Sequence, residues 1–185
     1  MIDDALELAK DAMDKACDRL RKELTRIRTG RANPAILDDI RVDSYGSQTP
    51  LNQVSTVTVQ DARLLVIKPW DRNLIGEIEK AINNASLGLN GNNDGVIVRV
   101  PIPPLTDERR HQLVKQAKES GEDAKIALRQ ARRESNELLK SAQKDSDISE
   151  DALKEGLSKI QTLTDSYVKR IDDVVKTKEV EILDS

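Results

Sequence analysis

The chain of 185 residues is 34% charged and only 2% aromatic, contains no Phe, and carries a formal net charge of −3. Aromatic side chains usually supply much of a core's buried area, so this composition favours helices packed through aliphatic side chains. A single cysteine, Cys17, excludes an intramolecular disulfide, and we expect it to be a reduced thiol. Because no apolar run is long enough to cross a membrane and the N-terminus resembles no targeting peptide, we expect a cytoplasmic location. We also expect the protein to be a monomer.

The first predicted element is an amphipathic helix over residues 2–29. Apolar residues recur there at spacings of three and four. Gly30 is well suited to end the helix, and Arg26 and Arg28 lie in its last turn, where cations suit the helix dipole. The predicted apolar stripe is Ile2, Leu6, Ala9, Met13, Ala16, Leu20, Leu24 and Ile27.

The sequence pattern changes over residues 31–104 and predicts a small β/α/β domain. The short β-branched runs "IRVDSY", "VSTVTV", "RLLVIKPW" and "GVIVRV" are typical of strands. Asp71 is a predicted N-cap for one helix, and the glycine-rich "GLNGNNDG" is predicted to form turns. The apolar stripe of that helix is Leu74, Ile75, Ile78 and Ile82.

Two long helices follow. Thr106 is a predicted N-cap for a helix that runs to about Lys144, and Ser149 caps the last helix, with Ile148 and Leu153 placed as a hydrophobic staple. The predicted seam of the first is Leu113, Ala117, Ala124, Leu128, Ala131, Ser135, Leu138 and Ala142. The predicted seam of the second is Leu153, Leu157, Ile160, Leu163, Tyr167, Ile171 and Val174.

Three helices with one apolar stripe each cannot stand alone, so we predict that they pack together. The predicted fold class is α+β, in which residues 1–30 and 105–185 form a long antiparallel three-helix bundle and residues 31–104 form the inserted domain. Two short connections would join the domains and act as hinges, near residues 30–34 and 101–106. The predicted hinge residues are Gly30, Arg31, Pro103 and Pro104.

Nothing in the sequence favours an enzyme. His111 is the only histidine and lies beside Arg109 and Arg110 on a predicted helix. Phosphate-loop, zinc-protease, paired-cysteine and nucleophile-elbow motifs do not occur. We therefore predict no catalytic residue, no metal site and no cofactor.

The distribution of charge is more informative than its total. Acids dominate residues 1–18, whereas bases dominate residues 19–31 and 109–133. In the second predicted bundle helix, one narrow sector of the helical wheel holds His111, Lys118, Lys125, Arg129 and Arg132, interrupted by Glu122. The bases around Gly30 and at the start of this helix predict a second basic region near the hinge.

Two interpretations of this sector stay open. Arg129 and Arg132 could form surface ion pairs with the acids of the first helix, Asp3, Asp4 and Glu7, worth about 0–1 kcal/mol each. Alternatively, the sector could follow the phosphates of structured RNA, recognised by backbone and shape because few aromatics are present to stack on bases. A non-enzymatic helical adaptor that pairs with protein helices is the other functional class.

The segments "IRTGRANPAILDDIRVDSYG", "VPIPPLTDERR", "ALRQARRESN" and "SEDALKEGLSKIQTLTDSYVKRID" resemble the bacterial ribosome recycling factor family, in order and over the whole chain. The resemblance implies an L-shaped, tRNA-like outline with a flexible elbow. It also implies binding to the post-termination ribosome, against large-subunit ribosomal RNA. Together with elongation factor G and GTP hydrolysis by that partner, such a factor splits the ribosome and releases mRNA and tRNA.

The resemblance also assigns roles to individual arginines. It implies that Arg132 in "ARRE" binds ribosomal RNA, with Arg129 and Arg133 beside it. The basic positions near the elbow that carry over from the family are Arg28, Arg31 and Arg110.

Overall fold

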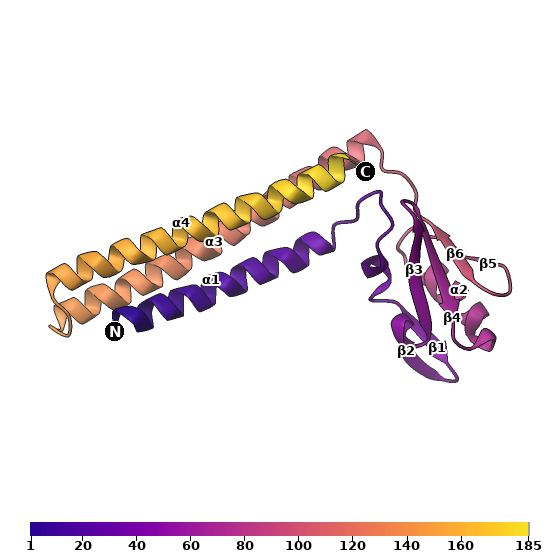
Figure 1. Cartoon of the computed structure of the whole chain (residues 1–185), viewed down its shortest axis with the longest axis horizontal. Coiled ribbons are helices and arrows are strands. Elements are labelled where there is room, and N and C mark those ends of the chain that lie inside the picture. The colour runs from indigo at the N-terminus through magenta and orange to yellow at the C-terminus, as the bar shows by residue number, and fades with distance from the viewer. Residues whose placement is uncertain (185) are drawn as a thin grey trace. The chain divides into compact units, whose positions relative to one another are not determined.

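The computed structural model describes residues 1–184, and their contacts divide the chain into two compact units. Residues 1–27 and 111–183 form the first, here called the helical unit, and residues 28–110 make up nearly all of the second, the sheet unit. The predicted α+β class is confirmed, with long helices in one unit and a small sheet in the other (Figure 1). Within residues 1–184, no helix is both long and apolar enough to cross a membrane.

The helical unit consists of α1 (Ile2–Thr25), α3 (Asp107–Lys144, from residue 111 onward) and α4 (Glu150–Leu183). These helices lie side by side in Figure 1. The α3–α4 pair is an antiparallel hairpin, and α1 runs parallel to α4, since Ile2 lies near Gly156 whereas Leu24 lies near Val174. The predicted caps are confirmed: the Thr106 hydroxyl accepts from the Arg109 N–H and the Ser149 hydroxyl from the Ala152 N–H.

The α3 seam differs from the prediction at two positions. Leu139 is fully buried, whereas the predicted Leu138 is 51% exposed, because the seam steps by four residues after Ser135 and not by three. Gly121 is a seam residue that the apolar pattern missed. A Cβ at position 121 would lie 2.6 Å from Val175 Cγ2 of α4, so the two helices approach more closely there than a residue with a side chain allows.

The first helix ends earlier than predicted. It stops at Thr25, four residues before position 29, and Ile27 is buried outside the helix with its N–H bonded to the Leu24 carbonyl. The apolar spacing extends to Ile27 because the chain still buries that side chain after the helix has ended. The prediction that Gly30 ends the helix is therefore wrong.

The sheet unit has the predicted helix and four predicted strands, with additions. Asp71 caps the helical segment as predicted, accepting from the Asn73 N–H, and that segment is a 3-10 turn, Arg72–Leu74, followed by α2 (Ile75–Asn84). The strands are β1 (Arg41–Ser44), β2 (Ser47–Pro50), β3 (Ser55–Asp61), β4 (Leu64–Pro69), β5 (Asn92–Asn93) and β6 (Val98–Pro101), with two more 3-10 turns at Pro34–Leu37 and Leu51–Gln53.

Antiparallel pairing joins β3, β4, β6 and β5 in that order, while β1 and β2 form a separate hairpin. The glycine-rich segment is not turns alone, because Asn92–Asn93 pairs with β6 as an edge strand. Alternate residues of β4 and β6 and one face of α2 contribute to an apolar core. Its fully buried members include Val42, Leu65, Ile67, Ile78, Ile82, Val98 and Val100.

Candidate nucleic-acid interface

The outer face of α3 carries a groove lined by arginines. Three of the predicted RNA-binding residues, Arg129, Arg132 and Arg133, lie along it within about one helical turn. We call this surface the arginine groove, and it is lined by Ile126, Arg129, Gln130, Arg132, Arg133, Asn136, Glu137 and Lys140. One face of a single helix therefore presents several cationic side chains, as a phosphate-binding surface requires.

These arginines are not neutralised by the acids of α1. Arg132 donates from Nη1 to Gln161 Oε1 of α4 at 3.3 Å, and Arg133 forms an exposed ion pair with Glu137 on its own helix at 3.1 Å. Arg129 makes no hydrogen bond or ion pair with any residue in 1–184. The interpretation that Arg129 and Arg132 pair with Asp3, Asp4 and Glu7 is therefore wrong for this structure.

Two lysines of the same predicted basic sector, unlike Arg129 and Arg132, have carboxylate partners. Lys118 pairs with Glu179 at 3.7 Å and Lys125 pairs with Asp172 at 2.7 Å, so both cations are neutralised by α4. The hydrogen bond that Lys125 Nζ donates to the Asp172 carboxylate raises the pKa of Lys125. The acids that face this sector come from α4. The sequence interpretation considered only the charges of the first two bundle helices and therefore did not identify these partners. The cationic surface is thus shorter than the sequence pattern suggested.

The other predicted arginines lie in the sheet unit, and two of the three have side-chain partners there. Arg28 donates through its guanidinium to the Leu87 carbonyl, in the loop after α2. Arg110 forms an ion pair with Asp107 at 3.2 Å in the first turn of α3. Arg31 is exposed. An RNA-binding role for these residues remains a prediction, and the bond to Leu87 gives Arg28 a local structural role as well.

Two further residues of the surface were missed from the sequence. Lys140 lines the arginine groove and lies seven residues after Arg133, so helical spacing alone could have included it. Gln161 contacts Arg132 from another helix, and no pattern within α3 indicates it.

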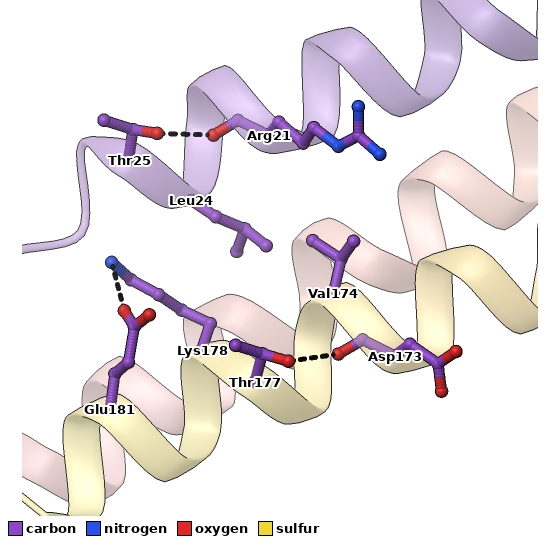
Figure 2. Close-up of a pocket in the computed structure, with 8 residues that line it drawn as sticks. All are labelled: Arg21, Leu24, Thr25, Asp173, Val174, Thr177, Lys178 and Glu181. Carbon is purple, nitrogen blue, oxygen red and sulfur yellow. Dashed lines mark hydrogen bonds and ion pairs between the residues drawn. The ribbon is translucent and has the colours of Figure 1, made fainter.

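A second groove lies between the C-terminal parts of α1 and α4 (Figure 2). Leu24 and Val174 point into it from opposite sides. Most of its polar side chains already have partners: the Thr25 and Thr177 hydroxyls donate to carbonyls of their own helices, Lys178 pairs with Glu181, and Arg21 lies 3.8 Å from Asp18. This groove offers no convergent polar groups for chemistry. Across residues 1–184, no cluster of three or more His, Cys, Asp or Glu side chains could hold a metal ion.

Comparison with known proteins gives one consistent result. The family model described as "Ribosome recycling factor" matches residues 20–183. A ribosome-recycling factor from Syntrophomonas wolfei is 50% identical over 184 residues, covering 100% of both chains. One from Shouchella clausii is 51% identical over 176 residues, covering 95% of both.

Two solved structures extend this similarity to the fold. A solution structure of the ribosome recycling factor matches 100% of this chain and 98% of its own, at 37% identity and a TM-score of 0.79. A second structure contains models of the T. thermophilus ribosome recycling factor and E. coli elongation factor G bound to the E. coli post-termination complex. It matches 99% of both chains at 40% identity and a TM-score of 0.66.

Proposed function

Because the chain belongs to the ribosome recycling factor family, we propose that it binds the post-termination ribosome in the cytoplasm. With elongation factor G, and with GTP hydrolysis by that partner, it splits the ribosome into subunits and releases mRNA and tRNA. The chain acts by binding and catalyses no reaction itself. A ligand shifts an equilibrium only through its different affinity for the two states, so the factor must bind the post-termination state and the free large subunit better than the intact resting ribosome.

The arginine groove is the surface that meets large-subunit ribosomal RNA in this proposal. The observation that carries it is the state of Arg129 and Arg132: both lie on one outer face of α3, and neither is paired with a carboxylate within residues 1–184. A guanidinium binds phosphate oxygens through two parallel N–H donors. A rigid helix presents those donors at fixed spacing, which suits recognition of RNA by backbone and shape.

The two connections between the units act as hinges in this proposal. Residues 28–33 follow the end of α1 without forming a helix or strand, and residues 102–106, which include Pro103 and Pro104, precede α3 in the same way. Short irregular segments of this kind absorb the backbone rotation when rigid bodies move. Spin-label distances between the units should therefore be broader than distances within the helical unit, and equally narrow distributions would refute the hinge.

The replacement Arg132→Ala tests the interface. The variant should keep its helical content and melting temperature, because Arg132 makes only one hydrogen bond to another helix. Its affinity for isolated large subunits should fall by about 1–3 kcal/mol, the range of a charge-assisted contact. The slope of log affinity against log salt should also fall by about one, as one phosphate contact is lost.

Two further variants sharpen this test. Arg132→Lys keeps the charge but loses the planar fork, so its affinity should lie between wild type and Arg132→Ala. Lys118→Ala removes the same charge from a residue already paired with Glu179, and it should change the salt slope less. Wild-type affinity and salt slope in a folded Arg132→Ala protein would remove Arg132 from the interface. Subunit splitting with elongation factor G and GTP, followed by light scattering, should decline in parallel with binding.

A further inference from the structure

Cationic residues of α3 meet α4 at intervals of seven residues. Lys118 pairs with Glu179 and Lys125 pairs with Asp172, so each step of seven along α3 is matched by a step of seven back along α4. This is the spacing expected for two antiparallel helices packed along one seam. Continuing it by one more step places Arg132 opposite Asp165.

The third pair does not form, because Gln161 is hydrogen-bonded to both Arg132 and Asp165. Its carbonyl oxygen accepts from Arg132 Nη1 at 3.3 Å, and its amide nitrogen donates to Asp165 Oδ1 at 2.8 Å. Among residues 1–184, Arg132 makes no ion pair with Asp165. Only a side chain that both accepts and donates can satisfy a guanidinium and a carboxylate together, and an amide does so whereas Glu or Lys cannot.

We propose that Gln161 is a positioning residue that keeps the Arg132 guanidinium apart from Asp165 and thereby available for a phosphate of ribosomal RNA. The inference rests on the proposed function of the arginine groove. An arginine already paired with a carboxylate must give up that pair before it binds phosphate, and it displaces fewer counterions when it does. A neutral amide carbonyl orients the guanidinium without neutralising it. The series of ion pairs between α3 and α4 therefore ends before Arg132, and this arginine stays available for binding.

The replacement Gln161→Ala tests this role. Without the amide, Asp165 is free to pair with Arg132, and affinity for isolated large subunits should fall about two- to fivefold, the range of a surface ion pair. The salt slope should fall as well, by up to about one. Helical content and melting temperature should stay close to wild type, since Gln161 is exposed.

The second-site variant separates positioning from a structural role. In Gln161→Ala/Asp165→Asn the carboxylate is absent, Arg132 is free again, and affinity and salt slope should return towards wild type. The control Gln161→Ala/Glu155→Gln removes one negative charge from α4 at a residue paired with Lys159, and it should not restore binding. Rescue by both double variants would reduce the effect to net charge and overturn the proposal.

The remaining outcomes distinguish this inference from the proposed function. If Arg132→Ala weakens binding but Gln161→Ala binds as wild type, the positioning role of Gln161 is wrong and the interface stands. A loss in Gln161→Ala that Asp165→Asn does not reverse also overturns the positioning role. If Arg132→Ala itself binds as wild type, the proposed role of Arg132 fails, and the inference about Gln161 fails with it.

Discussion

The helical unit and the sheet unit bury their apolar residues by different means. In the sheet unit, branched aliphatic residues from β4, β6 and α2 fill one buried core. In the helical unit each helix contributes only a narrow stripe, and its buried positions include several Ala residues and Gly121. Stability in the first case depends on the volume of the core, whereas in the second it depends on how closely the helix backbones approach.

The helical unit also contains a partly buried polar contact between two of its helices. The Tyr167 hydroxyl of α4 donates to Asp14 Oδ1 of α1, and the Arg170 guanidinium lies 4.7 Å from the centre of the Tyr167 ring. Tyr167 is the only aromatic residue of that unit and is almost fully buried. A buried hydroxyl must be satisfied, so this contact selects the register of α1 against α4 as well as stabilising it.

The largest effect should come from truncating the core of the sheet unit. Ile78 is fully buried in α2, and Ile78→Ala should lower the free energy of unfolding of that unit by about 2–5 kcal/mol, through lost transfer free energy and a residual cavity. Urea unfolding followed by the fluorescence of Trp70, the only tryptophan, measures it. Far-UV circular dichroism of the long helices should lag behind. A variant that unfolds with the wild-type midpoint would contradict a volume-dependent core.

A smaller loss should follow from adding one methyl group to the helical unit. Gly121→Ala places a Cβ within 2.6 Å of Val175, and Val cannot swing away as a longer side chain could. Overpacking should cost about 1–3 kcal/mol, more than the gain of about 1 kcal/mol from the better helix propensity of Ala. Thermal melting followed at 222 nm measures the difference. A rise in melting temperature would show that the helices can separate without cost.

The polar contact predicts a pH-dependent effect. Tyr167→Phe should cost about 1–2 kcal/mol at neutral pH, since it removes a hydrogen bond and leaves Asp14 without that donor. Burial, together with the hydrogen bond to Asp14, raises the pKa of Tyr167 to about 12. The unfolded phenol ionises near pH 10.

Wild-type stability should therefore lose a contribution as the pH rises from about 10 to 12, because the unfolded state releases its proton first. Tyr167→Phe lacks this contribution, so the stability difference between the two proteins should narrow over that range. Urea unfolding at a series of pH values tests it. A constant difference up to pH 12 would mean that Tyr167 ionises alike in both states.

The smallest expected effect is a gain in stability. It is expected at Gly76, the helix glycine of the sheet unit that is compared with Gly121 of the helical unit. A Cβ at Gly76 in α2 would meet no atom within 4 Å. Gly76→Ala should therefore raise the stability of the sheet unit by about 0.5–1 kcal/mol through helix propensity alone. Trp70 fluorescence in urea again reports it. A loss of stability would indicate that the backbone at residue 76 needs the freedom of glycine.

Local patterns in the sequence determined much of this protein. Spacings of three and four located the three long helices, β-branched runs located four of the six strands, and Asp71, Thr106 and Ser149 were identified as caps. These predictions succeed because helix periodicity and capping depend on residues a few positions apart. Helical spacing placed Arg129 and Arg132 in one sector, whereas the RNA-binding role of Arg129, Arg132 and Arg133 was implied by the family resemblance.

The tertiary structure alone decided which charges are neutralised. Lys118, Lys125 and Arg132 lie in one sector of α3 and look equivalent in sequence, yet the first two meet carboxylates of α4 and the third meets Gln161. The difference arises from the register of two antiparallel helices, set by side chains packed along their whole length. Electrostatic partners across such a seam are separated by tens of residues in the chain, so no local pattern can identify them.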